Sequence, residues 1–157
     1  NLPWYYEQRF SGYNYRMSDI SAALGLSQIS RLNNFIKYRN DIAKIYQNLI
    51  AEFPINSQKI KKYNRSSFHL FVVQLDLKRT KLNYEKIFKR FRKNNFFVNL
   101  HYMPLHLNKF FSKKGFTKGQ FPIAEHYGKC SLSIPIYPNL KKKYILKVVR
   151  IIKSVFI

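Results

Sequence analysis

The sequence predicts an α/β domain of modest size that follows one long helix. Apolar residues recur at helical spacing over residues 18–52, and two apolar, aromatic and β-branched segments, 68–77 and 96–100, flank a further helical pattern. The chain has 157 residues, of which 46% are hydrophobic and 17% aromatic, so it can bury one core. We therefore expect a folded domain rather than a disordered chain.

The long helix has clear start and stop signals. Ser18 can cap its N-terminus and Pro54 cannot continue a helix, so we expect one helix over residues 18–52, with a bend allowed. The polar and basic segment 57–67 is expected to form an exposed loop. Asn83 can cap the helix between the two expected strands.

The second half of the chain is expected to alternate short elements. Pro104 excludes a regular helix through residues 101–106, so a loop should leave the C-terminal end of the strand at 96–100, where functional side chains often lie. The remaining expected elements are helices over 107–111, 122–129 and 141–156 and a strand over 132–136.

The charge of the chain is strongly positive. Lys and Arg number 29 against 7 Asp and Glu, which gives a formal net charge of +22. Nucleic acid, acidic lipid or a phosphorylated substrate would explain the excess, and so would a compositional bias across the genome. The bias explains it better, because the lysines are spread along the chain and accompany many Asn and Ile residues.

The final helix concentrates part of this charge. Lys143, Lys147, Arg150 and Lys153 fall on one side, and a wide apolar remainder covers the rest. Such a helix could lie on a membrane surface, but docking of its apolar face against the sheet and a neighbouring domain is the favoured interpretation.

Several kinds of chemistry find no support in the residues. Cys130 is the single cysteine, and His101 and His106 have no acidic neighbour nearby in the sequence, so we expect neither a disulfide nor a metal site. Walker, Rossmann and nucleophile-elbow motifs are absent, and no carboxylates pair for acid and base work. A single cysteine fits a reducing setting, so a cytoplasmic location is expected, and no membrane helix or signal peptide is recognised.

Several ordered motifs carry a family resemblance. Residues 12–20 read Gly-Tyr-Asn-Tyr-Arg-Met-Ser-Asp-Ile, and the other matching segments are 67–71, 98–106, 121–125 and 132–138. Together they resemble the DegT/DnrJ/EryC1/StrS family of sugar aminotransferases, which depend on pyridoxal 5'-phosphate (PLP). The lead-in Trp-Tyr-Tyr-Glu at 4–7 and the loop at 101–106 look closest to the branch that aminates a UDP-linked 4-keto-6-deoxy amino sugar on the route to pseudaminic acid.

The resemblance implies the C-terminal small domain of a fold-type I PLP aminotransferase, with a small mixed or antiparallel sheet flanked by helices. On this basis residues 1–17 form a loop or interface segment, 18–52 a connecting helix and 53–157 the small α/β domain. The large PLP-binding domain, with its Schiff-base lysine, is expected upstream of this chain. We therefore expect no catalytic residue here and no activity from the chain alone, which begins without Met as a piece of a longer protein would.

The resemblance also assigns site residues. Asn14 would bind the phosphate of PLP across a homodimer interface, while His101, Tyr102 and His106 would line the sugar-nucleotide side of the cleft and Tyr6 would help to wall it. Glutamate is the expected amino donor. Structural roles stay open beside these: a turn amide for Asn14, ring packing beside the proline for the loop residues, and aromatic packing for Tyr6.

A basic nucleic-acid-binding domain is the alternative function. It rests on the charge of +22 and on the interleaved aromatic residues, which could neutralise phosphates and stack on bases. Many of these aromatics fall at apolar-periodic positions, however, and no nucleic-acid recognition motif is visible. We therefore expect no nucleic-acid partner and no membrane partner.

Overall fold

The computed structural model describes residues 2–156 and divides the chain after Leu32 into two compact units, each considered by itself. The first unit is extended up to helix α1 (Asp19–Ile29). As expected, Ser18 caps this helix, because its hydroxyl accepts a hydrogen bond from the Ser21 amide at 3.3 Å. No residue of α1 is buried, and its exposed large apolar side chains are Ile20, Leu24, Leu26 and Ile29.

The expected single helix over 18–52 is divided into α1 and α2 (Leu32–Ile50). The break lies at a turn formed by Ser30 and Arg31. The Ser30 hydroxyl donates to the Ser27 carbonyl at 2.8 Å, which is the acceptor that an unbroken helix would give to the Arg31 amide. That amide bonds to Gln28 instead, three residues back, at 3.1 Å. The hydrogen bonding at residues 30 and 31 is therefore that of a turn, and α1 ends before it.

Three antiparallel strands form the sheet of the second unit. In spatial order they are β1 (Ile55–Ser57), β2 (Phe71–Leu75) and β3 (Ser131–Ile134), and Val73 of β2 pairs with Ser57 on one side and Leu132 on the other. The expected fold class, an α/β domain with a small antiparallel sheet, is confirmed. Strand β1 was not expected, and the strand at 68–77 is shorter because Asp76 caps a 3₁₀ turn, η1 (Leu77–Arg79).

The expected strand over 96–100 is wrong as a regular element. Asn95 has a φ of 61°, and the Phe96 amide turns back to the Phe91 carbonyl at 3.0 Å, which uses its hydrogen bond within the turn after α3 (Tyr84–Lys93). Only Asn99 pairs with the sheet, through an isolated bridge to Ser133. The segment follows the edge of β3 without forming a ladder.

The remaining helices begin at recognisable signals. Asn83 caps α3 and accepts from the Lys86 amide at 2.9 Å, and Pro122 opens α5 (Pro122–Cys130). The short helix expected at 107–111 is instead a 3₁₀ turn, η2 (Leu105–Leu107), followed by α4 (Lys109–Ser112). The last helix is α6 (Lys142–Phe156).

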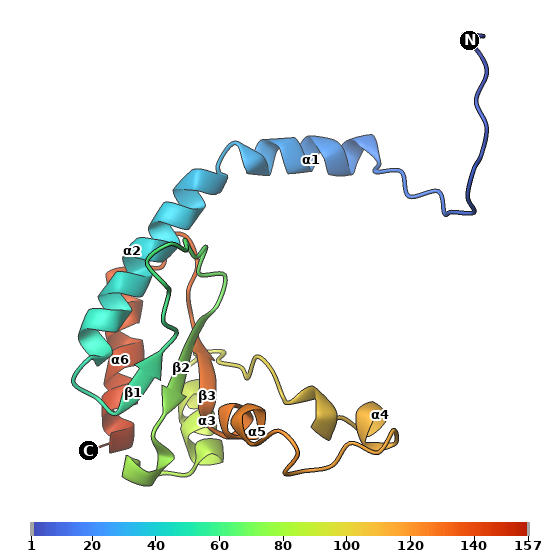
Figure 1. Ribbon diagram of the computed structural model, residues 1–157. Helices are drawn as coiled ribbons and strands as arrows, with labels where there is room; N and C mark the ends of the chain where they lie inside the picture. Colours follow the sequence, from blue (N-terminus) through green and yellow to red (C-terminus); the bar gives the residue numbers. More distant parts are fainter. Residues whose placement is uncertain (1, 157) are drawn as a thin grey trace. The chain divides into compact units, whose positions relative to one another are not determined.

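The core of the second unit lies where α2, α3 and α6 meet the sheet. Figure 1 shows α2 and α6 on the left of β2 and β3, with α4 and α5 on the right. Phe71 of β2 is fully buried, and its ring lies 5.3 Å from the ring of Tyr46 on α2. The buried residues of α6 are Ile145, Val148, Ile151, Ile152 and Val155.

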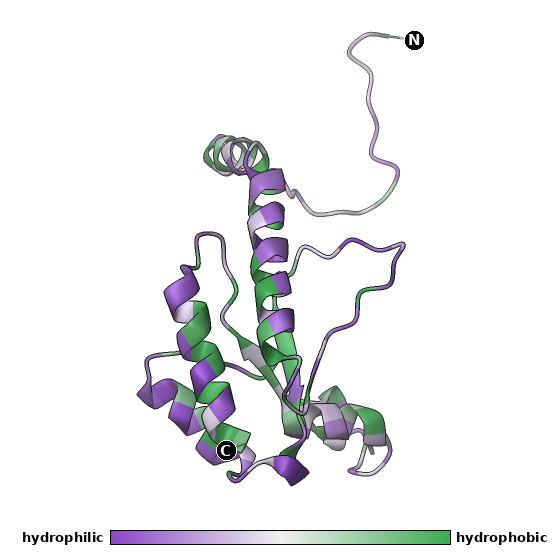
Figure 2. Cartoon of the chain, turned by 90° about the vertical axis from the view of Figure 1, so that its left-hand side faces the viewer, coloured by the Kyte–Doolittle hydropathy of each residue, from purple (hydrophilic) through white to green (hydrophobic). Residues whose placement is uncertain are grey.

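The burial of α6 confirms that its apolar face docks in the core. Figure 2 shows hydrophobic and hydrophilic bands along both α6 and α2, as a helix needs when one face is buried and the other is solvated. The basic residues Lys143, Lys147, Arg150 and Lys153 remain exposed.

Phe71→Ala is expected to destabilise the second unit by about 3–5 kcal/mol, because it leaves a cavity at the centre of the core. Phe97→Ala is the matched control, since that ring is 76% exposed and its loss should cost less than about 1 kcal/mol. Urea unfolding of both variants measures the difference. Equal losses of stability would show that the core is not centred on β2.

Candidate functional site

A cavity of about 480 Å³ lies between the segment before β2, the segment after α3 and the end of β3. Its volume is in the range typical of small-molecule sites. Its polar lining consists of His69, Asn95, Asn99, His101, Ser133, Tyr137 and Tyr144. No carboxylate lines it, so the cavity offers imidazole, amide and hydroxyl groups in surroundings without negative charge.

His101 is held in this cavity by two contacts. Its Nδ1 lies 2.8 Å from the Ser133 Oγ of β3, and the Tyr127 hydroxyl of α5 donates to the His101 carbonyl at 2.8 Å. Within residues 2–156 the Nε2 atom has no hydrogen-bond partner. Tyr102 follows through a cis peptide bond, is 71% exposed, and meets the His101 ring edge-on at 4.8 Å. The oriented His101 imidazole therefore keeps one nitrogen for a ligand.

Two side chains of α2 hold the rim of the cavity. The Arg39 guanidinium donates to the carbonyls of Phe68 and His69, both at 3.2 Å, and to that of Ile136 at 2.9 Å. The Tyr46 hydroxyl donates to the Pro135 carbonyl at 3.0 Å, and burial raises the pKa of Tyr46 well above its ordinary value. The hydroxyl therefore stays a donor, and the segments before β2 and after β3 are fixed together.

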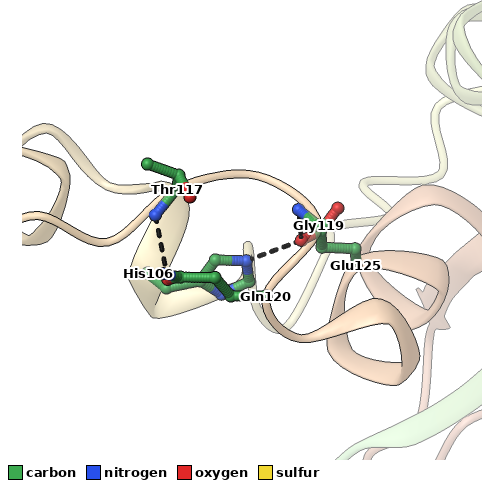
Figure 3. Close-up of polar contacts among 5 residues, drawn as sticks. All are labelled: His106, Thr117, Gly119, Gln120 and Glu125. Atoms are coloured by element: carbon green, nitrogen blue, oxygen red, sulfur yellow. Dashed lines mark hydrogen bonds and ion pairs between the residues drawn. The ribbon is translucent and has the colours of Figure 1, made fainter.

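His106 does not line this cavity. Figure 3 shows its ring against Glu125 of α5, with His106 Nε2 at 2.9 Å from Glu125 Oε1, which also accepts from the Gly119 amide. The hydrogen bond from His106 is the largest cause that lowers the pKa of Glu125 below its usual 4.5. Both side chains are buried, so the ring of His106 holds the 105–125 segment in place.

Neither Glu125 nor Arg39 was expected at the site. Glu125 lies 19 residues from His106, and Arg39 lies 97 residues from Ile136, so sequence spacing gave no signal for either contact. The one available clue to Glu125 was the small number of carboxylates. In a chain with only 7 of them, a carboxylate that is buried is expected to have a specific partner.

Gly128 of α5 allows the loop at 101–106 to lie close to the helix. A Cβ at this position would come within 2.6 Å of the Pro104 Cδ and 3.0 Å of its Cγ. The proline ring cannot move far without shifting the loop, so glycine is required for this contact.

Asn14 and Tyr6 belong to the first unit and are not joined to the other site residues by this structure. Tyr6 is 92% exposed, and the exposed amide of Asn14 has no hydrogen-bond partner among the described residues. A free amide donor fits the phosphate of PLP. Every lysine in residues 2–156 is exposed.

A metal centre and a membrane-spanning helix both lack support within the described residues. No group of three or more His, Cys, Asp or Glu residues within 2–156 is placed to hold a metal ion. In the same range, no helix combines the length and apolar character needed to cross a membrane.

Comparison with known proteins assigns the class. Over 154 residues the chain is 34% identical to an uncharacterised protein, MJ1066, of Methanocaldococcus jannaschii, covering 97% of this chain and 40% of that protein. It is 32% identical over 133 residues to the UDP-4-amino-4,6-dideoxy-N-acetyl-beta-L-altrosamine transaminase of Campylobacter jejuni, covering 84% and 35%. The PLP form of Spr1654, a proposed sugar aminotransferase of Streptococcus pneumoniae, matches with a TM-score of 0.84 and 25% identity over 98% of this chain and 39% of that one.

The fold is therefore that of the small-domain portion of PLP aminotransferases. The pattern of the DegT/DnrJ/EryC1/StrS aminotransferase family matches residues 3–153, and the chain belongs to that family. It spans about 40% of the length of the relatives that it matches.

Acidification is expected to loosen the 105–125 segment before the rest of the fold. Because the folded pKa of Glu125 lies below 4.5, its ionised form stabilises the segment above that pH, and the stabilisation is lost as the pH falls through the lowered pKa. Hydrogen exchange by mass spectrometry, corrected for intrinsic rates, measures this. Glu125→Gln should expose the segment already near neutral pH, whereas Glu52→Gln, at an exposed position, should behave like wild type. An unaltered pH profile in Glu125→Gln would contradict the assignment.

Proposed function

We propose that this chain is the C-terminal part of a PLP-dependent aminotransferase that moves an amino group from glutamate to a UDP-linked 4-keto-6-deoxy sugar. The observation that carries the proposal is the cavity beside His101, which presents a ligand-free imidazole nitrogen and no carboxylate. Phosphate and sugar hydroxyls suit such a lining. The named activity of the Campylobacter jejuni relative supports a sugar linked to UDP. The pseudaminic acid route is proposed from the resemblance of residues 4–7 and 101–106.

In this proposal the second unit binds and orients the sugar nucleotide. His101 Nε2 donates to a diphosphate or sugar oxygen, and the exposed Tyr102 hydroxyl adds a second donor on the same loop. His106 acts through the loop, because its ring is engaged with Glu125. Tyr6 is proposed as an aromatic wall of the same cleft.

The first unit is proposed to serve the cofactor. PLP, when bound, supplies the electron sink for amino transfer. The Asn14 amide donates to its phosphate from the neighbouring subunit of a homodimer, and the cofactor-bearing lysine lies outside this chain. The assembled enzyme is proposed to be cytoplasmic.

Binding of UDP-N-acetylglucosamine to the chain tests the sugar-nucleotide site. We expect His101→Ala to weaken binding about tenfold or more, since a hydrogen bond to a charged group contributes roughly 1.5–3 kcal/mol. His126→Ala, an exposed histidine on α5, is the control and should leave affinity unchanged. Calorimetry gives both affinities, and equal affinities for the two variants would remove His101 from the site.

Asn14→Ala tests the cofactor contact in the full-length aminotransferase. Loss of a neutral donor to a phosphate should lower PLP affinity by about one to two orders of magnitude, with the fold intact. Asn48→Ala, on the exposed side of α2, is the matched control. A PLP titration with thermal melts separates the outcomes. Unchanged PLP affinity, or a collapsed fold, would make Asn14 structural.

A further inference from the structure

A basic groove of about 540 Å³ lies between α3 and α6, and the proposed aminotransferase function does not use it. Arg90 and Lys93 of α3 line one side, and Lys147 and Arg150 of α6 line the other. No carboxylate is among the lining residues. Four cationic side chains thus surround one hollow without a negative partner.

One of these cations is held in a fixed orientation. The Arg90 Nη1 donates to the Ser154 carbonyl at 2.8 Å and to the Ser154 Oγ at 2.9 Å. The same serine hydroxyl donates to the Ile151 carbonyl at 2.8 Å, so it is itself oriented by α6. These neutral contacts position the guanidinium but leave its charge uncompensated.

Helix dipoles account for the positions of only two of the four cationic side chains in the groove. Arg90 and Lys93 lie in the last turn of α3, where cations stabilise a helix. Lys147 and Arg150 lie in the middle of α6, where the dipole gives no such benefit. Helix α6 has no acidic residue, and the acid of α3, Glu85, is paired with Lys89 at 2.6 Å. The groove therefore gathers like charges that repel one another.

We propose that this groove is a binding site for a compact multivalent phosphate, such as inorganic triphosphate or the triphosphate of a nucleotide. An anion with several phosphate oxygens can accept from the Arg and Lys donors on both helices at once and relieve their repulsion. The groove has the volume of a small-molecule site. A single-stranded nucleic acid is disfavoured because it needs a row of stacking rings, and Phe96 is the one aromatic residue among those lining the groove.

Calorimetric titration of the chain with inorganic tripolyphosphate tests the proposal at moderate salt. The double variant Lys147→Gln/Arg150→Gln should bind at least about tenfold more weakly than wild type. The control Lys44→Gln/Lys59→Gln carries the same change of charge in a separate basic hollow and should lose less than about twofold. The charge-conserving variant Lys147→Arg should retain binding, which separates charge from packing.

Each outcome decides the matter. An equal loss in both double variants would show diffuse attraction to a chain of charge +22 and would overturn the site, as would absence of binding by wild type. Tighter binding of an oligothymidylate than of tripolyphosphate, lost in the same groove variant, would overturn the ligand class. A titration with ATP beside tripolyphosphate identifies the source, since equal affinities indicate that the phosphates alone are recognised. Circular dichroism verifies that each variant is folded.

Discussion

The candidate site depends on a supply of hydrogen-bond donors from α2 to backbone carbonyls at the rim of the cavity. Segments that enter β2 and leave β3 carry carbonyl groups that have no strand partner, most of them on buried or half-buried residues, and unpaired buried acceptors destabilise a fold. Arg39 and Tyr46 satisfy four of these carbonyls from one helix face. All three Arg39 contacts come from its Nη1 atom, so one nitrogen serves three carbonyls. The shape of the cavity therefore depends on how α2 packs against the sheet.

The chain has only 7 carboxylates, and none of them lines either of the two hollows discussed above. Glu125 is buried with His106 and fixes a loop, whereas Glu85 pairs with Lys89 in solvent, where such pairs contribute little. The cavity beside His101 and the groove between α3 and α6 both lack a carboxylate in their lining. An acidic side chain in either place would repel the phosphate groups that are proposed to bind there.

Local signals in the sequence predicted most helix starts, whereas the contacts that build the candidate site join residues far apart in the sequence. Ser18, Asn83 and Pro122 mark helix starts because caps act within one turn. The break between α1 and α2 lies at a turn at residues 30–31, and a turn after α3 takes the place of the expected strand at 96–100. At the site, the loop at 101–106 was predicted from Pro104, but no spacing rule connects His106 with Glu125 or Arg39 with Ile136.

The contact between Gly128 and Pro104 makes the residue allowed at each position depend on the other, although the two are 24 residues apart in the sequence. A side chain at position 128 is compatible with the fold only if the residue at 104 loses its ring, and a displaced Pro104 carries the loop of His101 with it. Substitutions at these two positions should therefore occur together across lineages. The surface of α5 at Gly128 thus limits how closely the loop at 101–106 can approach the helix.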